Sequence, residues 1–143
     1  MTPEQIDQMP AGKPLEALIA EHVMEWRLVP EEHKAWVKMA WRQLTGPHHE
    51  NEPEAMIVVP HGDGTWHYQH PSWFSTDIHA IWQLVEKMKP LRLWLADFGD
   101  YWQASFLEED SGEGVKANGD TAMLAICRAA LKSKLALNKR GEK

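Results

Sequence analysis

Cysteine occurs once in this sequence of 143 residues, at Cys127. A single thiol can form neither an intramolecular disulfide nor a cysteine-rich zinc site, which favours a reducing, cytosolic compartment. Long apolar runs are also absent: no stretch approaches a membrane span of about 18 residues, and the charged first residues do not resemble a signal peptide. Since a chain of this length can bury a stable core unaided, we expect one domain over residues 1–143 and no membrane partner.

Basic residues are fewer than acidic residues. The sequence has 15 lysines and arginines and 21 aspartates and glutamates, which gives a formal net charge of −6. This balance argues against a nucleic-acid partner, since such proteins neutralise phosphates with basic surfaces. The C-terminal tail over residues 132–143 is the exception, being rich in lysine and arginine. We interpret it as a solvated helix end, because the helix dipole favours cations near a helix C-terminus.

Phenylalanine and tyrosine are scarce, with three and two copies, whereas tryptophan occurs eight times. Trp26 and Trp82 continue the apolar stripes of predicted helices, so we expect both in the core. Four other tryptophans fall in a predicted hairpin or in a predicted insertion: Trp94 and Trp102, and Trp36 and Trp41. Trp66 and Trp73 are left without a structural explanation.

Helical signals recur along the chain. Thr2, Pro3 and Gln5 predict a short helical turn that stops at residues 10–12. Apolar spacings of three and four residues predict helices over 14–29, 30–44, 78–88 and from 121 onward. The buried stripe of the third of these is expected to consist of Ile78, Ile81, Trp82, Val85 and Met88.

Two hairpins are expected between these helices. Strands over 56–59 and 65–69 flank a glycine-containing turn, and strands over 91–98 and 101–107 flank Gly99-Asp100, a tight turn with glycine first. A glycine-rich acidic loop over 108–119 is predicted to lead to the last helix. Helices on both sides of the hairpins predict an α+β fold, a three-layer α/β/α sandwich with a central antiparallel sheet built from hairpins.

Three blocks of the sequence resemble the phage ABA sandwich domain family. They lie at residues 9–26, opening with Met9-Pro10-Ala11-Gly12, at residues 74–82, opening with Phe74-Ser75-Thr76-Asp77-Ile78, and at residues 120–131, opening with Asp120-Thr121-Ala122. The resemblance implies an α/β/α sandwich and a viral protein made in the host bacterial cytoplasm, and it implies no settled chemistry. Residues 28–53 depart from the family pattern, so the helix over 30–44 is expected to belong to an insertion over 30–53.

Motifs for catalysis, metals and cofactors are missing. His67 and His70 point to opposite faces of one predicted strand, so they and His61 are not expected to converge as zinc ligands. Cys127 lies on the inward stripe of an alanine-rich helix, and no glycine pattern of a nucleotide-binding loop occurs. The sequence therefore predicts no catalytic set, no metal site and no cofactor, and ranks a histidine-dependent hydrolase last among the hypotheses.

Aromatic side chains crowd into residues 66–74, around the first hairpin and the start of the next helix. Rings that stack on a flat ligand, beside hydroxyls and free amides that receive phosphate, are typical of a nucleotide site. Asp77 argues against phosphate at this helix start, because like charges repel. The predicted ligand-binding residues are Trp66, Tyr68, Trp73, Phe74, Ser75, Thr76 and Arg128.

Two functions of different class fit these features. The first is a non-enzymatic phage accessory protein that binds a small ligand, in its sharpest form by sequestering a nucleotide-type immune signal. The alternative is a protein interaction module, in which tryptophans anchor a homo-oligomer or block a host protein. A closed aromatic pocket would favour the ligand, and a flat aromatic patch would favour the interface.

Overall fold

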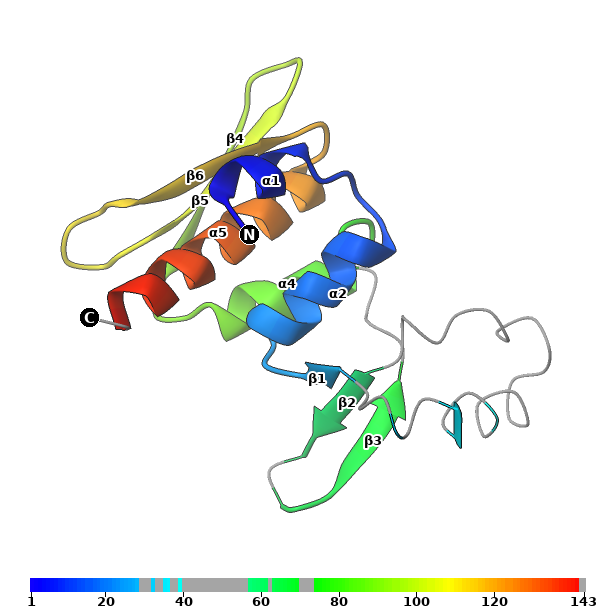
Figure 1. The fold of residues 1–143 in the computed structure, drawn as a ribbon. Coiled ribbons are helices and arrows are strands. Elements are labelled where there is room, and N and C mark those ends of the chain that lie inside the picture. The colour runs from blue at the N-terminus through cyan, green and yellow to red at the C-terminus, as the bar shows by residue number, and fades with distance from the viewer. Residues whose placement is uncertain are drawn as a thin grey trace.

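The fold combines helices with two three-stranded antiparallel sheets (Figure 1). The computed structural model describes residues 1–28, 32, 35–36, 39, 57–61, 63–69 and 74–141. The helices are α1 (Pro3–Gln8), α2 (Lys13–His22), α4 (Ile78–Lys87) and α5 (Ala122–Gly141). One sheet has the order β1 (Arg27–Leu28), β2 (Ile57–Pro60), β3 (Trp66–Gln69), and the other has the order β4 (Arg92–Asp97), β5 (Trp102–Leu107), β6 (Gly114–Gly119).

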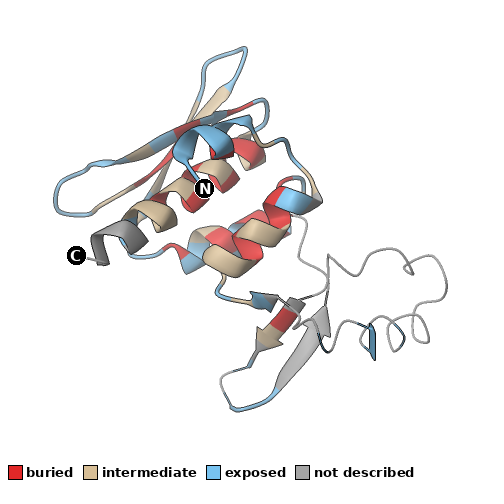
Figure 2. Ribbon diagram, viewed as in Figure 1, coloured by how far each residue is buried: buried red, intermediate tan, exposed pale blue. Residues whose placement is uncertain are grey.

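Helix α5 is the centre of the packing. It lies along one face of the β4–β5–β6 sheet and contacts α1, α2 and α4, while α2 also contacts β1 (Figure 1). Buried residues concentrate where α2 and α5 face each other and where α5 faces the strands (Figure 2). The largest fully buried apolar side chains come from the four helices, from β5 and from residues that flank α2 and α4: Ile6, Leu15, Ile19, Val23, Phe74, Leu84, Met88, Phe106 and Leu131.

The β4–β5–β6 sheet places alternate residues on its two faces, as strand geometry requires. Leu93 pairs with Phe106, and Phe106 pairs with Val115, which forms an apolar row toward α5. Small residues let α5 approach closely, and a Cβ atom on Gly119 would lie 2.6 Å from the backbone nitrogen of Ala125. The expected tight turn at Gly99-Asp100 is confirmed, with Gly99 at a φ of 91° and the Phe98 amide donating to the Tyr101 carbonyl.

The segment expected to be a loop before the last helix contains strand β6, so the prediction of a loop over all of 108–119 is wrong. Val115 and Ala117 point inward while Lys116 and Asn118 are exposed, which is the alternation of a half-buried strand. Glycines at both ends of this strand gave the segment the composition of a loop. Pairing with β5 over its whole length overrides that local preference.

The two predicted hairpins are both present, and the mixed α+β class is confirmed. They do not join one central sheet, because β2–β3 pairs with β1 and β4–β5 pairs with β6. The second predicted helix ends at His22, before Trp26, and β1 follows it. The three-layer order of the sandwich stays a prediction.

Helix α4 corrects the interpretation of Trp82 as a core residue. Ala80, Ile81, Leu84 and Met88 are buried, whereas Ile78 is 68% exposed and Trp82 is 61% exposed. The apolar arc of this helix is wider than the face that α5 and the core can cover, and Ile78 and Trp82 lie beyond its edge. Trp26, by contrast, packs against the core, with its ring 6.0 Å from that of Phe74.

The predicted helix over 30–44 and the insertion over 30–53 lie outside the described residues, apart from Glu32, Ala35, Trp36 and Met39. Trp36 and Met39 are exposed. Among the helices that the structure describes, none combines the length and apolarity needed to cross a membrane.

Candidate functional site

Phe74 and Ser75, two of the predicted ligand-binding residues, are buried in the core. The Ser75 hydroxyl donates to Glu16 Oε2 at 2.8 Å and accepts from the Gly12 amide at 3.1 Å. The Ser75 amide also donates to Glu16 Oε2, at 3.3 Å. These bonds satisfy a buried carboxylate and a buried hydroxyl at once, so Ser75 joins α2 to the segment before α4.

The remaining described residues of the predicted aromatic site lie on different segments, Thr76 before α4 and Trp66 and Tyr68 on β3. Thr76 is exposed, beside Asp77, whose Oδ1 accepts from the amides of His79 and Ala80 at the start of α4. A carboxylate therefore occupies the amides that a phosphate would need there. Trp66 and Tyr68 lie on β3, paired in register with Pro60 and Val58, and Trp73 lies outside the described residues.

Arg128, the last predicted ligand residue, holds two backbone segments together. Its guanidinium donates twice to the Met9 carbonyl, at 2.8 and 3.2 Å, and once to the Asn118 carbonyl, at 2.8 Å. The bonds tie the end of α1 to the edge strand β6. Neighbouring Lys132 acts similarly, since its ammonium pairs with Asp7 at 2.9 Å and donates to the Lys116 carbonyl at 2.9 Å.

The three sequence blocks singled out above meet around the loop between α1 and α2. Arg128 from the third block binds the Met9 carbonyl, and Ser75 from the second accepts from the Gly12 amide. The carboxylate of Glu16, from the first block, accepts a hydrogen bond from the Ser75 hydroxyl. These matched residues specify a hydrogen-bonded junction of the fold.

Cys127 adjoins this junction. Burial, and to a smaller extent the Glu16 carboxylate, raises the pKa of its thiol far above the ordinary value. The thiolate is the nucleophilic form of cysteine, so this side chain stays an inert thiol in the folded protein. Its role is to fill space beside α2.

The histidine-containing hairpin turn is an exposed structure. A hydrogen bond from the Thr65 hydroxyl lowers the pKa of Asp63, and the Thr65 amide donates to the same carboxylate at 2.9 Å. His61 is exposed beside it, and His67 lies on β3. Within the described ranges, no three histidine, cysteine, aspartate or glutamate side chains are grouped so that they could hold a metal ion.

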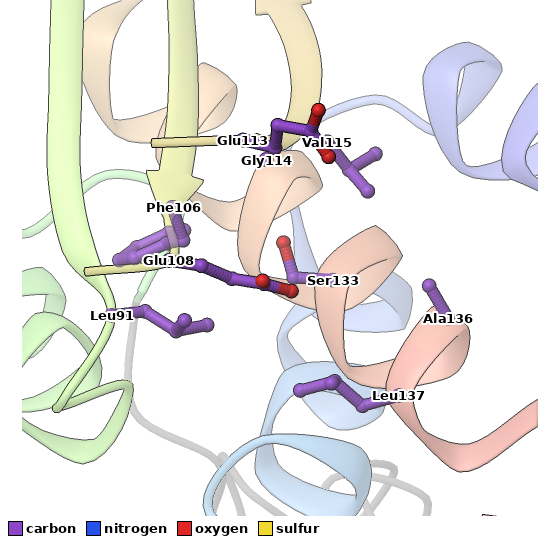
Figure 3. Close-up of a pocket in the computed structure, with 9 residues that line it drawn as sticks. All are labelled: Leu91, Phe106, Glu108, Glu113, Gly114, Val115, Ser133, Ala136 and Leu137. Atoms are coloured by element: carbon purple, nitrogen blue, oxygen red, sulfur yellow. The ribbon is translucent and has the colours of Figure 1, made fainter. Parts of the chain in front are cut away.

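A cavity opens between the C-terminal half of α5 and the start of β6 (Figure 3). It encloses about 160 Å³. Five apolar side chains, three polar side chains and one glycine form its wall. The lining residues are Leu91, Phe106, Glu108, Glu113, Gly114, Val115, Ser133, Ala136 and Leu137.

Ser133 is the unusual member of this wall. It is 5% exposed, and its hydroxyl has no hydrogen-bond partner within the described part of the chain. Figure 3 shows this hydroxyl pointing from α5 toward the strands. Leaving a buried hydroxyl unpaired costs about 1–3 kcal/mol, so the cavity carries an unsatisfied polar group aimed at its interior.

The two carboxylates of the cavity stand on the turn that joins β5 to β6. The Glu108 amide donates to the Glu113 carbonyl at 2.8 Å, and the Gly112 amide donates to the Glu108 carbonyl at 2.9 Å. Ser111 braces the turn, since its hydroxyl donates to Glu108 Oε2 at 3.2 Å and accepts from the Glu113 amide at 3.1 Å. In Figure 3 the Glu108 side chain extends toward Ser133.

This cavity was not predicted from the sequence. Glu108 belongs to an acidic run that looks solvated, and the turn that places it depends on the unexpected strand β6. A signal was present in α5, because Ile126, Ala130, Ser133 and Leu137 share one face at spacings of four, three and four. A polar side chain in such an inward stripe marks either a buried hydrogen bond or a site.

Comparison with known proteins agrees with the resemblance in the three blocks. The sequence model of the phage ABA sandwich domain matches residues 17–131, and no curated protein matches the chain. The fold is similar to the 2.0 Å crystal structure of a phage protein from Bacillus cereus ATCC 14579, with a TM-score of 0.51 and 19% identity over 93% of this chain and 87% of that chain. The chain therefore belongs to the phage ABA sandwich domain family.

Proposed function

We propose that this phage protein is a non-enzymatic accessory protein of the host bacterial cytoplasm that binds a small ligand in the α5 cavity. The observation that carries the proposal is the buried Ser133 hydroxyl, which lacks a partner among the described residues and lines the cavity. A ligand that pairs with this hydroxyl would recover the free energy lost by burying it. Concave, mostly apolar walls with a few convergent polar groups are typical of ligand sites.

The narrower proposal, sequestration of a nucleotide-type immune signal, has less support. Phe74 and Ser75 are engaged in the core, and Arg128 is bonded to backbone carbonyls. The groove beside Arg128 also holds Lys132, whose charge is paired with Asp7. A nucleotide would therefore depend on Trp66, Tyr68, Trp73 and Thr76, of which Trp73 lies outside the described residues.

A thermal-shift screen followed by calorimetry tests the proposal. The compounds should span cyclic nucleotides, adenosine-diphosphate-ribose isomers, organic acids, neutral alcohols and amines. At 100 times its Kd, a ligand of the native state adds about 2.7 kcal/mol to the free energy of unfolding, which a melting curve resolves.

The matched control for this screen is Ser133→Leu, which fills the cavity with a larger apolar side chain. We expect at least one compound class to stabilise the wild-type protein and to have no effect on this variant. Stabilisation that persists in Ser133→Leu would place the ligand elsewhere, and no stabilisation by any class would overturn the function.

A second candidate function is favoured by the exposed side of α4. Ile78 and Trp82 stand one helical turn apart, with half-buried Val85 beside them. The charges near this stripe are paired within the chain, Lys89 with Glu86 at 3.0 Å and Lys87 with Glu25 at 3.7 Å. A two-fold contact sets a surface against itself, so an apolar stripe with a neutralised rim fits a second copy of this chain.

Sedimentation or light scattering tests the self-association. We expect a dimer whose dissociation constant rises at least tenfold in Trp82→Glu, because a charge would then be buried at the centre of the contact. The control is Gln83→Glu, which adds the same charge on the neighbouring exposed position outside the stripe. A monomeric wild-type protein, or equal weakening by both substitutions, would rule out this interface.

A further inference from the structure

Strand β4 forms an open edge of the β4–β5–β6 sheet. The strand order places β5 on one side of β4, and in the described part of the chain no strand lies on its other side (Figure 1). An edge strand exposes backbone N–H and C=O groups that a further strand can bind, so folded proteins usually cover or block such edges. An edge that is left uncovered is therefore a candidate interface.

The opposite edge of this sheet, strand β6, is blocked by two side chains of α5. The Lys132 ammonium donates to the Lys116 carbonyl at 2.9 Å, and the Arg128 guanidinium donates to the Asn118 carbonyl at 2.8 Å. Both carbonyls point away from β5, so these bonds occupy acceptors that a further strand would need. Within the described residues, no side chain forms such a bond with the backbone of β4.

The hydrogen-bond pattern between β4 and β5 identifies the free groups of β4. The Phe98 amide donates to the Tyr101 carbonyl at 2.9 Å, so Phe98 and every second residue before it bond to β5. The backbone groups of Leu93, Leu95 and Asp97 consequently point away from β5. In the part of the chain that the structure describes, these outward groups have no backbone partner.

We propose that β4 pairs with β4 of a second copy of this chain, antiparallel and about a two-fold axis, so that one sheet runs through both copies. The row of free groups is complementary to itself. It is bounded by Leu91, whose amide donates to the carbonyl at the C-cap of α4 at 3.1 Å, and by Gly99, whose amide donates to Asp97 Oδ1 at 2.8 Å. With Leu95 on the axis, Leu93 of each copy lies opposite Asp97 of the other, and every free group of the row has a partner.

The side chains on the face opposite α5 are complementary in this register. Arg92 lies across from Phe98 of the second copy, and Trp94 lies across from Ala96. Arg92 is exposed and has no ion-pair partner among the described residues. Phe98 is 52% exposed, and its ring stacks on that of Tyr101 at 5.2 Å. A guanidinium over an aromatic ring is a favourable contact, and the two-fold axis forms it twice.

Leu95 supplies the apolar contact at the axis. It is 38% exposed in the single chain, and the same residue of the second copy covers it. The pairing uses neither the α5 cavity nor α4, so it goes beyond both functions proposed above.

Hydrogen exchange followed by nuclear magnetic resonance tests the pairing in the full chain carrying Trp82→Glu. This background adds a charge to the α4 stripe, so that self-association there does not contribute. In dilute protein the outward amides of Leu93, Leu95 and Asp97 should exchange rapidly, and the amide of Trp94, bonded to β5, should exchange slowly. At millimolar protein we expect exchange of the three outward amides to slow at least tenfold.

Leu95→Lys should prevent the pairing in the same background, because lysines on edge strands oppose strand addition and two like charges would meet at the axis. We expect the dissociation constant measured by sedimentation to rise at least tenfold. Asn118→Lys is the matched control, since it adds the same charge at an exposed position of the blocked edge, and it should leave the constant unchanged. A protein that stays monomeric at millimolar concentration, outward amides whose exchange does not depend on concentration, or equal weakening by both substitutions would overturn the inference.

Discussion

Replacing Phe106 with alanine should lower the free energy of unfolding by about 3–5 kcal/mol, the usual cost of removing a buried phenylalanine ring. Phe106 is fully buried in the middle of the β4–β5–β6 sheet, between Leu93 and Val115 in the register. It lies beneath α5 and also forms part of the cavity wall. Urea denaturation followed by far-ultraviolet circular dichroism measures the change.

Phe106→Leu is the matched variant, since it keeps an apolar side chain of similar size in the core. We expect it to lose less than about 1.5 kcal/mol of stability. A loss below 1 kcal/mol for Phe106→Ala would contradict the packing of α5 on this sheet.

Replacing Arg128 with alanine should cost about 2–3 kcal/mol of stability, because hydrogen bonds from a charged donor contribute more than neutral ones. The guanidinium holds the Met9 and Asn118 carbonyls, so its loss separates the end of α1 from strand β6. Arg128→Lys should recover only part of this loss, since one ammonium group cannot reproduce the planar fork. Chemical denaturation of both variants measures the effect.

This prediction separates the two roles considered for Arg128. A positioning role in the fold lowers stability and leaves the affinity of the α5 cavity for its ligand nearly unchanged in the folded fraction. If Arg128→Ala unfolds at the wild-type denaturant concentration and abolishes the binding of a nucleotide, Arg128 is a ligand residue, as the sequence analysis expected.

Strong local signals in the sequence predicted the elements that build the sheet and helix layers. The Thr2 and Gln5 capping box opens α1, and Asp77 caps α4. Gly99 permits the tight turn between β4 and β5 because it adopts a positive φ without a steric cost. Such features depend on residues within a few positions of each other, so the sequence shows them directly.

Strand β6 and the exposure of Trp82 depend on distant parts of the chain. Gly114 and Gly119 disfavour a strand locally, and only the ladder with β5 makes one. The width of the apolar arc on α4 is visible in the sequence, but which part of it α5 covers is set by tertiary packing. The prediction that Ile78 and Trp82 are buried was therefore wrong, since both are exposed.

The candidate site, too, depends on residues that are distant in the sequence. The three blocks that resemble the family meet at one junction. There Arg128 donates to the Met9 carbonyl, and the Ser75 hydroxyl accepts from the Gly12 amide and donates to Glu16. Their hydrogen bonds join residues 59 to 119 positions apart, so a single sequence could not tell this structural role from ligand binding. The α5 cavity combines Ser133 with turn residues that lie 20 to 25 positions earlier, and no local pattern joins them.

The most direct test of the account is a nuclear magnetic resonance titration of isotope-labelled protein with a compound that stabilises the wild-type protein but not Ser133→Leu in the thermal-shift screen. A site in the α5 cavity predicts that the backbone amide signals of Phe106, Val115 and Ser133 shift together and saturate with one affinity. The signals of Thr76 and His79, at the start of α4, should stay in place. Shifts confined to Thr76, His79 and the β3 strand, or no saturable shift at all, would contradict a ligand site between α5 and the β5–β6 turn.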